Sequence, residues 1–326
     1  MSGQNALANL MAEYRSRTSW NERLSHWELP ASQSEETMIE RAAGMVRNSL
    51  SANSWLTGEK VLIQAQGSYH NNTNVRREAD MDLRVIHPTY KVDYDESVIQ
   101  QNLADNLLGL RETGRTLSDV CSTMRSHVAL SLGASFGWEN LDINGNKAMR
   151  VHKLPGSRAD VDIVPSFRYL WVSWPQGYSM PVQTEGVAIL GKDGTWTYNF
   201  PEQHHTNGIA KRARTAHRFK KVVRSLKRIR DELVAMGSLD KKQVPSYLVE
   251  CLVYAVEDPY FLVQSDDRYD RIIRILGRMS QLINDAAWTQ RATEINGIKF
   301  LFHPAQTWTV DSAKAFIVDA YSRLTA

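Results

Sequence analysis

Apolar residues recur at helical spacing over long stretches of the chain. In residues 34–52 they lie three or four positions apart after a polar start at Ser34-Glu35-Glu36, which predicts one long helix. Its apolar positions are Met38, Ile39, Ala42, Ala43, Met45, Val46 and Leu50. The same spacing predicts further helices over residues 5–25, 95–111, 115–132, 205–236, 244–257, 267–285 and 310–324.

Strand patterns occupy the first two thirds of the chain. Proline interrupts a strand ladder, so Pro88 is expected to end a strand that begins at residue 79. Residues 168–200 are aromatic and rich in turns, with a hairpin turn expected at residues 191–194. Their tryptophans, at positions 171, 174 and 196, are expected in the core of a second sheet. The predicted strands cover residues 59–66, 79–87, 147–153 and 158–165.

The pattern becomes mostly helical after Pro201. A chain of 326 residues is long for a single core, which favours two lobes. We therefore predict an α+β fold in two parts. Residues 1–204 form a lobe with a mixed sheet, helices and a long N-terminal helix, and residues 205–326 form a helical lobe.

Charge adds one feature to this picture. The formal net charge of +3 is too small to indicate a nucleic-acid-binding protein by itself. The charge is unevenly spread, however, because residues 211–230 contain ten lysines and arginines and no acidic residue. This basic run is expected to face an anionic ligand, either a triphosphate or a nucleic acid.

Several classes of protein are disfavoured by composition. Cys121 and Cys251 are far apart, and neither has a Cys or His neighbour at zinc-ligand spacing. Without a disulfide framework, a reducing compartment fits. The N-terminus lacks the basic and apolar regions of a signal peptide, and no apolar run approaches the roughly 18 residues of a membrane span. We expect a cytoplasmic protein without a membrane segment.

The strongest chemical signal lies in residues 64–85. Val61, Leu62 and Ile63 lead into Gly67-Ser68, and Asp80-Met81-Asp82 follows on the next predicted strand. A Gly-Ser turn can offer N–H groups and a hydroxyl to phosphate oxygens. Two Asp residues at i and i+2 share one strand face and suit Mg²⁺ together with substrate phosphates. This order predicts a nucleotide-triphosphate site with two metal ions.

The motif resembles the signature of the nucleotidyltransferase superfamily that includes polymerase beta, poly(A) polymerases and cyclic GMP-AMP synthase. That signature adds a third acid in an apolar setting, for which Asp162 in Ala159–Pro165 is the candidate and Asp160 the fallback. The resemblance implies that Asp80, Asp82 and Asp162 hold two Mg²⁺ ions, with Mn²⁺ as a substitute, and that Ser68 holds the β- and γ-phosphates.

A second match lies in the helical lobe. In enzymes similar to cyclic GMP-AMP synthase, a helix lysine and a later Ser-Tyr pair complete the nucleotide pocket, and the matching positions here are Lys227, Ser246 and Tyr247. The resemblance implies that Lys227 and Ser246 grip the triphosphate and that Tyr247 stacks on a base. The alternatives are a solvated helix charge for Lys227 and a helix N-cap for Ser246.

Other polar residues near these motifs carry weaker signals. Gln66 can reach a base or ribose. Arg76 and Arg77 are expected to be solvated, although a phosphate contact stays open. His204 and His205 lie beside an acid but lack further ligands, which favours a role at a helix start over a metal site.

The whole layout resembles the bacterial cGAS/DncV-like nucleotidyltransferases of antiphage CBASS systems. This resemblance implies synthesis of a cyclic di- or trinucleotide from NTPs, with ATP as one substrate, and a separate effector reached through the product. No Cys/His cluster for a DNA-sensing zinc thumb is present in the sequence. A linear oligonucleotide polymerase and a transferase that modifies a protein or small molecule stay open. Retention of three acids argues against a non-enzymatic nucleic-acid-binding scaffold.

Overall fold

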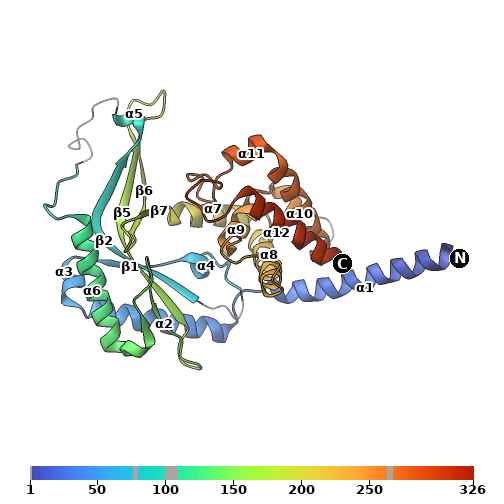
Figure 1. Ribbon diagram of the computed structural model, residues 1–326, viewed down its shortest axis with the longest axis horizontal. Helices are drawn as coiled ribbons and strands as arrows, with labels where there is room; N and C mark the ends of the chain where they lie inside the picture. Colours follow the sequence, from blue (N-terminus) through green and yellow to red (C-terminus); the bar gives the residue numbers. More distant parts are fainter. Residues whose placement is uncertain (1, 76–79, 100–108, 263–266) are drawn as a thin grey trace. The chain divides into compact units, whose positions relative to one another are not determined.

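The computed structural model describes residues 2–75, 80–99, 109–262 and 267–326 (Figure 1). The chain divides into two compact units. We call residues 32–70 and 79–202 the sheet unit, and residues 1–31, 71–78 and 203–326 the helical unit. Arg76 and Arg77 lie outside the described residues. Among the residues that are described, no helix combines the length and the apolar character needed to cross a membrane.

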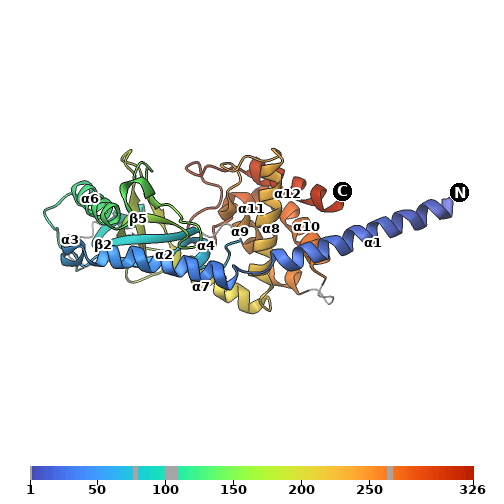
Figure 2. The same cartoon turned by 90° about the horizontal axis from the view of Figure 1, so that it is seen from below.

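The sheet unit is built on one seven-stranded mixed sheet in which β2 and β5 are the longest strands. They run parallel to each other, and the remaining pairings are antiparallel. The helix α2 packs on β2 and β5, and α6 packs on β5 (Figure 2). The strands are β1 (Leu62–Gln66), β2 (Asp80–Tyr94), β3 (Leu141–Asp142), β4 (Met149–Val151), β5 (Asp160–Ser173), β6 (Val182–Leu190) and β7 (Trp196–Asn199).

The helices of the sheet unit are mostly short. The exceptions are α2, in which Ser32 and Glu35 form a capping box, and α6. Most of the helix predicted over residues 95–111 lies outside the described residues; α5 covers residues 96–99, and residues 109–111 are not helical. The helices are α2 (Gln33–Ser51), α3 (Ser54–Gly58), α4 (Gly67–His70), α5 (Glu96–Ile99), α6 (Leu117–Phe136) and the 3₁₀ helix η2 (Trp138–Asn140).

Two strand predictions are corrected by the structure. Pro88 does not end β2, because the pairing with β5 shifts register between His87 and Tyr90 and then continues. Proline is tolerated at such an irregularity since its missing N–H is not needed there. Residues 168–200 do not form a second sheet, because β5, β6 and β7 join the same sheet. The hairpin turn at residues 191–194 is confirmed, with the Gly194 N–H donating to the Gly191 carbonyl at 3.0 Å.

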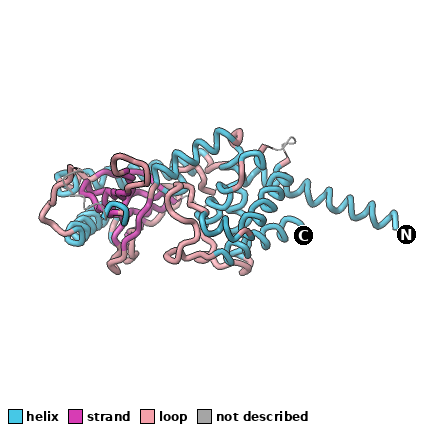
Figure 3. The backbone as a smooth tube through the Cα atoms, turned by 90° about the horizontal axis from the view of Figure 1, so that it is seen from above, coloured by secondary structure: helices cyan, strands magenta, loops and turns pink. Residues whose placement is uncertain are grey.

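The helical unit contains none of the described strands (Figure 3). Its core joins apolar residues of α8, α9, α10 and α12 with Trp20 and Leu24 of α1. This contact explains why residues 1–31 group with the helical unit, whereas the prediction placed them in the first lobe. The helices are α1 (Ser2–Trp27), α7 (Pro201–Arg214), α8 (Arg218–Ala235), α9 (Ser246–Ala255), η3 (Asp258–Phe261), α10 (Arg268–Asn284), α11 (Ala286–Arg291) and α12 (Val310–Thr325).

The predicted helix over residues 205–236 is two helices. The chain leaves α7 at Thr215, and Ala216 and His217 adopt positive φ angles of 47° and 65°. The Thr215 hydroxyl donates to the Lys211 carbonyl at 2.8 Å and accepts from the Phe219 N–H at 3.1 Å. The second bond gives the Phe219 N–H, in the first turn of α8, a partner that the interrupted helix does not supply.

Candidate active site

The acidic pair lies at the start of β2, on one face of the sheet. Burial alternates over the first four residues of the strand, and Met81 and Leu83 are buried on the opposite face. The neighbouring parallel strand β5 sets Asp160 opposite Asp80 and Asp162 opposite Asp82. Two strands therefore bring four carboxylates onto one sheet face, and this block contains all three predicted catalytic acids.

The block is electrostatically costly. Burial, followed by the charges of Asp162 and Asp80, raises the pKa of Asp82 to about 7. Burial likewise raises the pKa of Asp80 above its usual value. Like charges at short range disfavour ionisation of one another, and a cation reverses that effect. The site is therefore electrostatically suited to a positively charged ligand.

The two candidates for the third acid have different partners. Arg150 on β4 holds Asp162 with two hydrogen bonds of 2.6 Å, from Nε to Oδ1 and from Nη2 to Oδ2. Asp160 Oδ1 accepts from the Lys153 N–H at 2.9 Å. Arg150 was not among the predicted site residues. Its only signal in the sequence is the alternation Met149-Arg150-Val151, and pairing of β4 with β5 is what aims it at Asp162.

The residue types at this site suit divalent metal ions. Carboxylate oxygens are the ligands that Mg²⁺ prefers, and Asp80, Asp82 and Asp162 supply them from one face. Within the described ranges, however, no three His, Cys, Asp or Glu side chains converge closely enough to hold an ion. Arg150 engages both oxygens of Asp162. The residue types therefore fit divalent metal ions, and Arg150 engages Asp162 at the same time.

The Gly-Ser turn lies directly against the acids. Gly67 has a φ of +74°, and a Cβ placed on it would lie 1.9 Å from Asp82 Oδ2. The backbone conformation and the approach of the carboxylate therefore both favour glycine at this position. Ser68 is the next residue in α4 and is half-buried, and Gln66 pairs with Asp82 across β1 and β2. The structure thus brings Gln66, Gly67 and Ser68 to the acidic block.

The helical unit holds the other predicted nucleotide-binding residues. Lys227 is 3% exposed, and its ammonium donates to Glu250 Oε2 at 2.8 Å and to the Thr73 carbonyl at 3.2 Å. The solvated helix charge that was the alternative for Lys227 is therefore wrong. His204 also contacts this carboxylate, with 3.2 Å between Nε2 and Glu250 Oε1. His204 and His205 lie in the first turns of α7, as the helix-start interpretation predicts.

Ser246 and Tyr247 begin α9. Ser246 is exposed and is the first helical residue, so the N-cap position predicted for it belongs to Pro245. The Tyr247 hydroxyl donates to Glu294 Oε2 at 2.9 Å. The Tyr247 ring stacks on the His204 ring, with centroids 5.6 Å apart. The hydroxyl of Tyr247 is thus held by a hydrogen bond, and its ring packs against the His204 ring.

The basic run of residues 211–230 does not form an open anion-binding surface. Half of its ten cations are buried and donate to carbonyl or carboxylate oxygens within the helical unit. Arg214, although exposed, pairs with Asp258. In the structure the buried half of this run is engaged inside the helical unit rather than open to a ligand, and a phosphate contact by Lys227 stays a prediction. The buried members are Lys211, Lys220, Arg224, Lys227 and Arg230.

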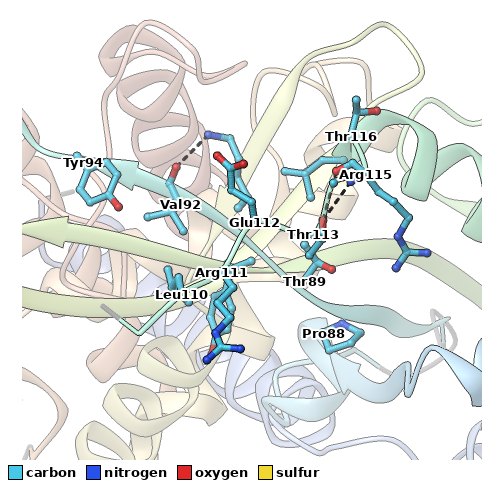
Figure 4. Close-up of a pocket in the computed structure, with 14 residues that line it drawn as sticks. Pro88, Thr89, Val92, Tyr94, Leu110, Arg111, Glu112, Thr113, Arg115 and Thr116 are labelled. Carbon is cyan, nitrogen blue, oxygen red and sulfur yellow. Dashed lines mark hydrogen bonds between the residues drawn. The ribbon is translucent and has the colours of Figure 1, made fainter. Parts of the chain in front are cut away.

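A cavity of about 1150 Å³ lies elsewhere in the sheet unit (Figure 4). Its walls are residues 88–92 and Tyr94 of β2 and the segment 110–117. None of the four aspartates lines it. The candidate active site is therefore defined by the acidic sheet face and the Gly-Ser turn, and not by this cavity.

Both units are similar to parts of known proteins. Residues 206–325 match the cGAS/DncV-like nucleotidyltransferase C-terminal helical domain. A cyclic dipyrimidine nucleotide synthase CdnE of Legionella pneumophila is 33% identical over 303 residues, which cover 93% of this chain and 97% of that protein. A cyclic dipurine nucleotide synthase of Elizabethkingia meningoseptica is 27% identical over 93% of this chain and 97% of its own length. The similarity therefore extends over nearly the whole chain.

Solved structures agree on the fold. The Elizabethkingia meningoseptica CdnE cyclic dinucleotide synthase with GTP and Apcpp has a TM-score of 0.73 at 24% identity, covering 93% of this chain and 98% of that one. The Rhodothermus marinus CdnE c-UMP-AMP synthase with Apcpp and Upnpp has a TM-score of 0.72 at 23% identity, covering 92% of this chain and 94% of that one. At these identities the likeness shows a shared fold, and the predicted two-part α+β architecture is confirmed.

Proposed function

Because this chain belongs to the cGAS/DncV-like nucleotidyltransferases, as its Legionella relative shows, we propose that it joins nucleoside triphosphates into a cyclic dinucleotide. The observation that carries the proposal is the acidic block beside Gly67, in which β2 and β5 present Asp80, Asp82 and Asp162 together. Relatives that are named cyclic dinucleotide synthases support the reaction class. The product would act as a signal to a separate effector in an antiphage system.

In this reaction a ribose hydroxyl attacks an α-phosphate and pyrophosphate leaves. Divalent metal ions are general in the family, and two bound Mg²⁺ ions would supply charge neutralisation and an activated hydroxyl. We assign Asp80, Asp82 and Asp162 as the residues that would hold them. Asp162 also accepts the proton of the attacking hydroxyl in this proposal. Arg150 orients Asp162 through two charge-assisted hydrogen bonds in the structure described here.

The remaining proposed residues bind the nucleotide. Ser68 and the N–H groups around it hold the β- and γ-phosphates, and Gln66 contacts a ribose or base. Ser246, exposed at the first turn of α9, adds a hydroxyl at a helix N-terminus, where anions are favoured. A phosphate contact by Lys227 requires its ammonium to release Glu250. Base stacking by Tyr247 uses the ring while its hydroxyl stays bonded to Glu294.

Incubation with mixtures of ATP, GTP, CTP and UTP and Mg²⁺ or Mn²⁺ tests the proposal. Small products that resist phosphatase are expected, because cyclisation removes terminal phosphates. The Asp80→Asn and Asp82→Asn double variant should form none, since a carboxamide is a poor Mg²⁺ ligand. Ladders of linear product would replace the proposal with template-independent polymerisation. If product forms only when an acceptor protein or small molecule is added, the enzyme transfers the nucleotide to that acceptor. Wild-type turnover in the double variant would end the assignment of the acids.

A further inference from the structure

The segment between the Gly-Ser turn and the acidic strand belongs to the opposite unit. Ser68 lies in α4 of the sheet unit, but residues 71–78 group with the helical unit before the chain returns to β2. We call residues 71–75, the described part of this segment, the strap. The strap is not in a helix or a strand. Its backbone polar groups therefore need other partners.

Basic residues of α8 supply those partners. Lys220 Nζ donates to the Asn71 carbonyl at 2.6 Å. Arg224 Nη1 donates to the Asn72 carbonyl at 2.7 Å, and its Nε donates to the Glu28 carbonyl at 2.8 Å. Positions i and i+4 of a helix lie on one face, so the two side chains reach consecutive strap carbonyls from one side. Both cations are buried, at 6% and 5% exposure.

The same face of α8 continues to the third strap residue. Lys227 Nζ contacts the Thr73 carbonyl, and the Thr73 hydroxyl donates to Glu250 Oε2 at 2.9 Å. At the other end of the strap, the Asn71 Oδ1 lies 3.0 Å from His205 Nδ1. Three consecutive strap residues are therefore fixed on the helical unit through main-chain as well as side-chain contacts.

Burying a cation is unfavourable unless its N–H groups are satisfied. Lys220 and Arg224 donate to main-chain carbonyls of the strap, so these hydrogen bonds hold its backbone. An apolar side chain would fill the same space without this effect. The consequence reaches Ser68, because only two residues separate it from Asn71.

We propose that Lys220 and Arg224 are positioning residues for nucleotidyl transfer, which fix the strap and thereby the Gly67-Ser68 turn that contacts the triphosphate. This inference rests on the proposed function. The turn is held at its start by β1 and by the contact of Gly67 with Asp82, and at its end by the strap. Loss of the hydrogen bonds to the strap is expected to leave the end of this turn less restrained.

The test compares Lys220→Met with Lys221→Met. Lys221 is the next residue of the same helix and carries the same charge, but it is half-exposed and pairs with Glu28 rather than with the strap. Because a displacement of about 1 Å can cost roughly 100-fold in rate, we expect Lys220→Met to lower kcat roughly 10- to 100-fold, while Lys221→Met keeps the wild-type rate. Lys220→Arg, which keeps a charged donor, should keep most of the wild-type kcat.

A double-mutant cycle with Ser68→Ala separates positioning from general destabilisation. If Lys220 acts through the turn, Lys220→Met costs little further rate in the Ser68→Ala background, whereas a purely structural effect costs the same in both. Rates are corrected for the folded fraction. Additive losses, an unaffected rate in Lys220→Met, or an equal loss in Lys221→Met would overturn the proposal.

Hydrogen exchange of the peptide that covers residues 67–75 provides a readout that needs no catalysis. Exchange there should rise in Lys220→Met and in Arg224→Lys, which cannot reach both Glu28 and Asn72, and stay unchanged in Lys221→Met. Unchanged exchange in both strap variants would overturn the positioning role even with a low rate. If the wild-type protein forms no nucleotide product, the proposed function fails, and the exchange result still decides whether the strap is held as described.

Discussion

Replacing Gly67 with alanine perturbs the placement of Asp82 at the Gly-Ser turn. The added Cβ would lie 1.9 Å from Asp82 Oδ2, so the carboxylate has to retreat by about 1.5 Å to reach an ordinary contact of 3.4 Å. The atom in the way is the end of a flexible side chain, and rotation of Asp82 relieves the clash at little cost in stability. The same rotation takes a proposed metal ligand out of place.

The size of the effect follows from two separate contributions. Alanine at positive φ costs about 1–2 kcal/mol of stability. A carboxylate displaced by more than 1 Å costs roughly 100-fold in rate. Gly156 offers a matched control, because its φ is also +74° and a Cβ there meets nothing within 4 Å. Gly156→Ala should therefore lose the same stability and keep nearly the wild-type rate.

The assay measures initial rates of cyclic product formation at saturating NTP, together with thermal unfolding of both variants. We expect similar melting temperatures for Gly67→Ala and Gly156→Ala and a rate about 100-fold lower for the first. A wild-type rate in Gly67→Ala would refute the reasoning, since the clash with Asp82 would then have no consequence for the reaction. An equal loss of rate in Gly67→Ala and Gly156→Ala would attribute the defect to backbone strain.

Other variants test the third acid, the tyrosine and the buried ion pair. Asp162→Asn should be nearly inactive in the product assay and Asp160→Asn substantially active, and the reverse ranking would reassign the third acid. Tyr247→Ala should weaken nucleotide binding by about 1–3 kcal/mol in a titration, whereas Tyr247→Phe should not; equal damage would give the role to the hydroxyl. Burial alone raises the pKa of Glu250, but Lys227 holds it well below its usual range. The stabilisation is then present above the unfolded pKa of about 4.3 and lost as the pH falls toward the folded value, so the destabilisation of Glu250→Gln in urea unfolding should shrink below about pH 4. A gap that is independent of pH would contradict the ion pair.

The position of the acidic pair and the Gly-Ser turn in the sheet unit could be predicted because both are short patterns in the sequence. Gly67-Ser68 and Asp80-Met81-Asp82 are short patterns, and strand alternation alone assigns Asp80 and Asp82 to one face. The relation of that face to Asp162 depends on the parallel register of β2 and β5, which joins residues about 80 positions apart. Arg150 was missed for the same reason, since a lone arginine in a short strand acquires meaning only through its partner strand.

Charge was the least predictable property from the sequence. A run of lysines and arginines has the composition of an anion-binding surface, but periodicity decides which members face inward. On α8, Lys220, Arg224 and Lys227 recur at i, i+4 and i+7, which is the spacing of a buried helix face. The strap that receives them comes from a segment about 150 residues earlier in the chain. No local sequence pattern predicts the contact between α8 and the strap.

The basic residues of α8 and the carboxylates of β2 and β5 are two clusters of like charge, and their charges are balanced differently. The buried cations of α8, Lys220, Arg224 and Lys227, donate to carbonyl and carboxylate oxygens inside the helical unit. Among the described residues, Arg150 forms its hydrogen bonds with Asp162, and burial together with the charges of Asp162 and Asp80 raises the pKa of Asp82 to about 7. An anionic triphosphate cannot approach such a face alone. Cations that accompany the nucleotide would lower the repulsion between substrate and acids, which is why we propose the acidic block as the place of catalysis.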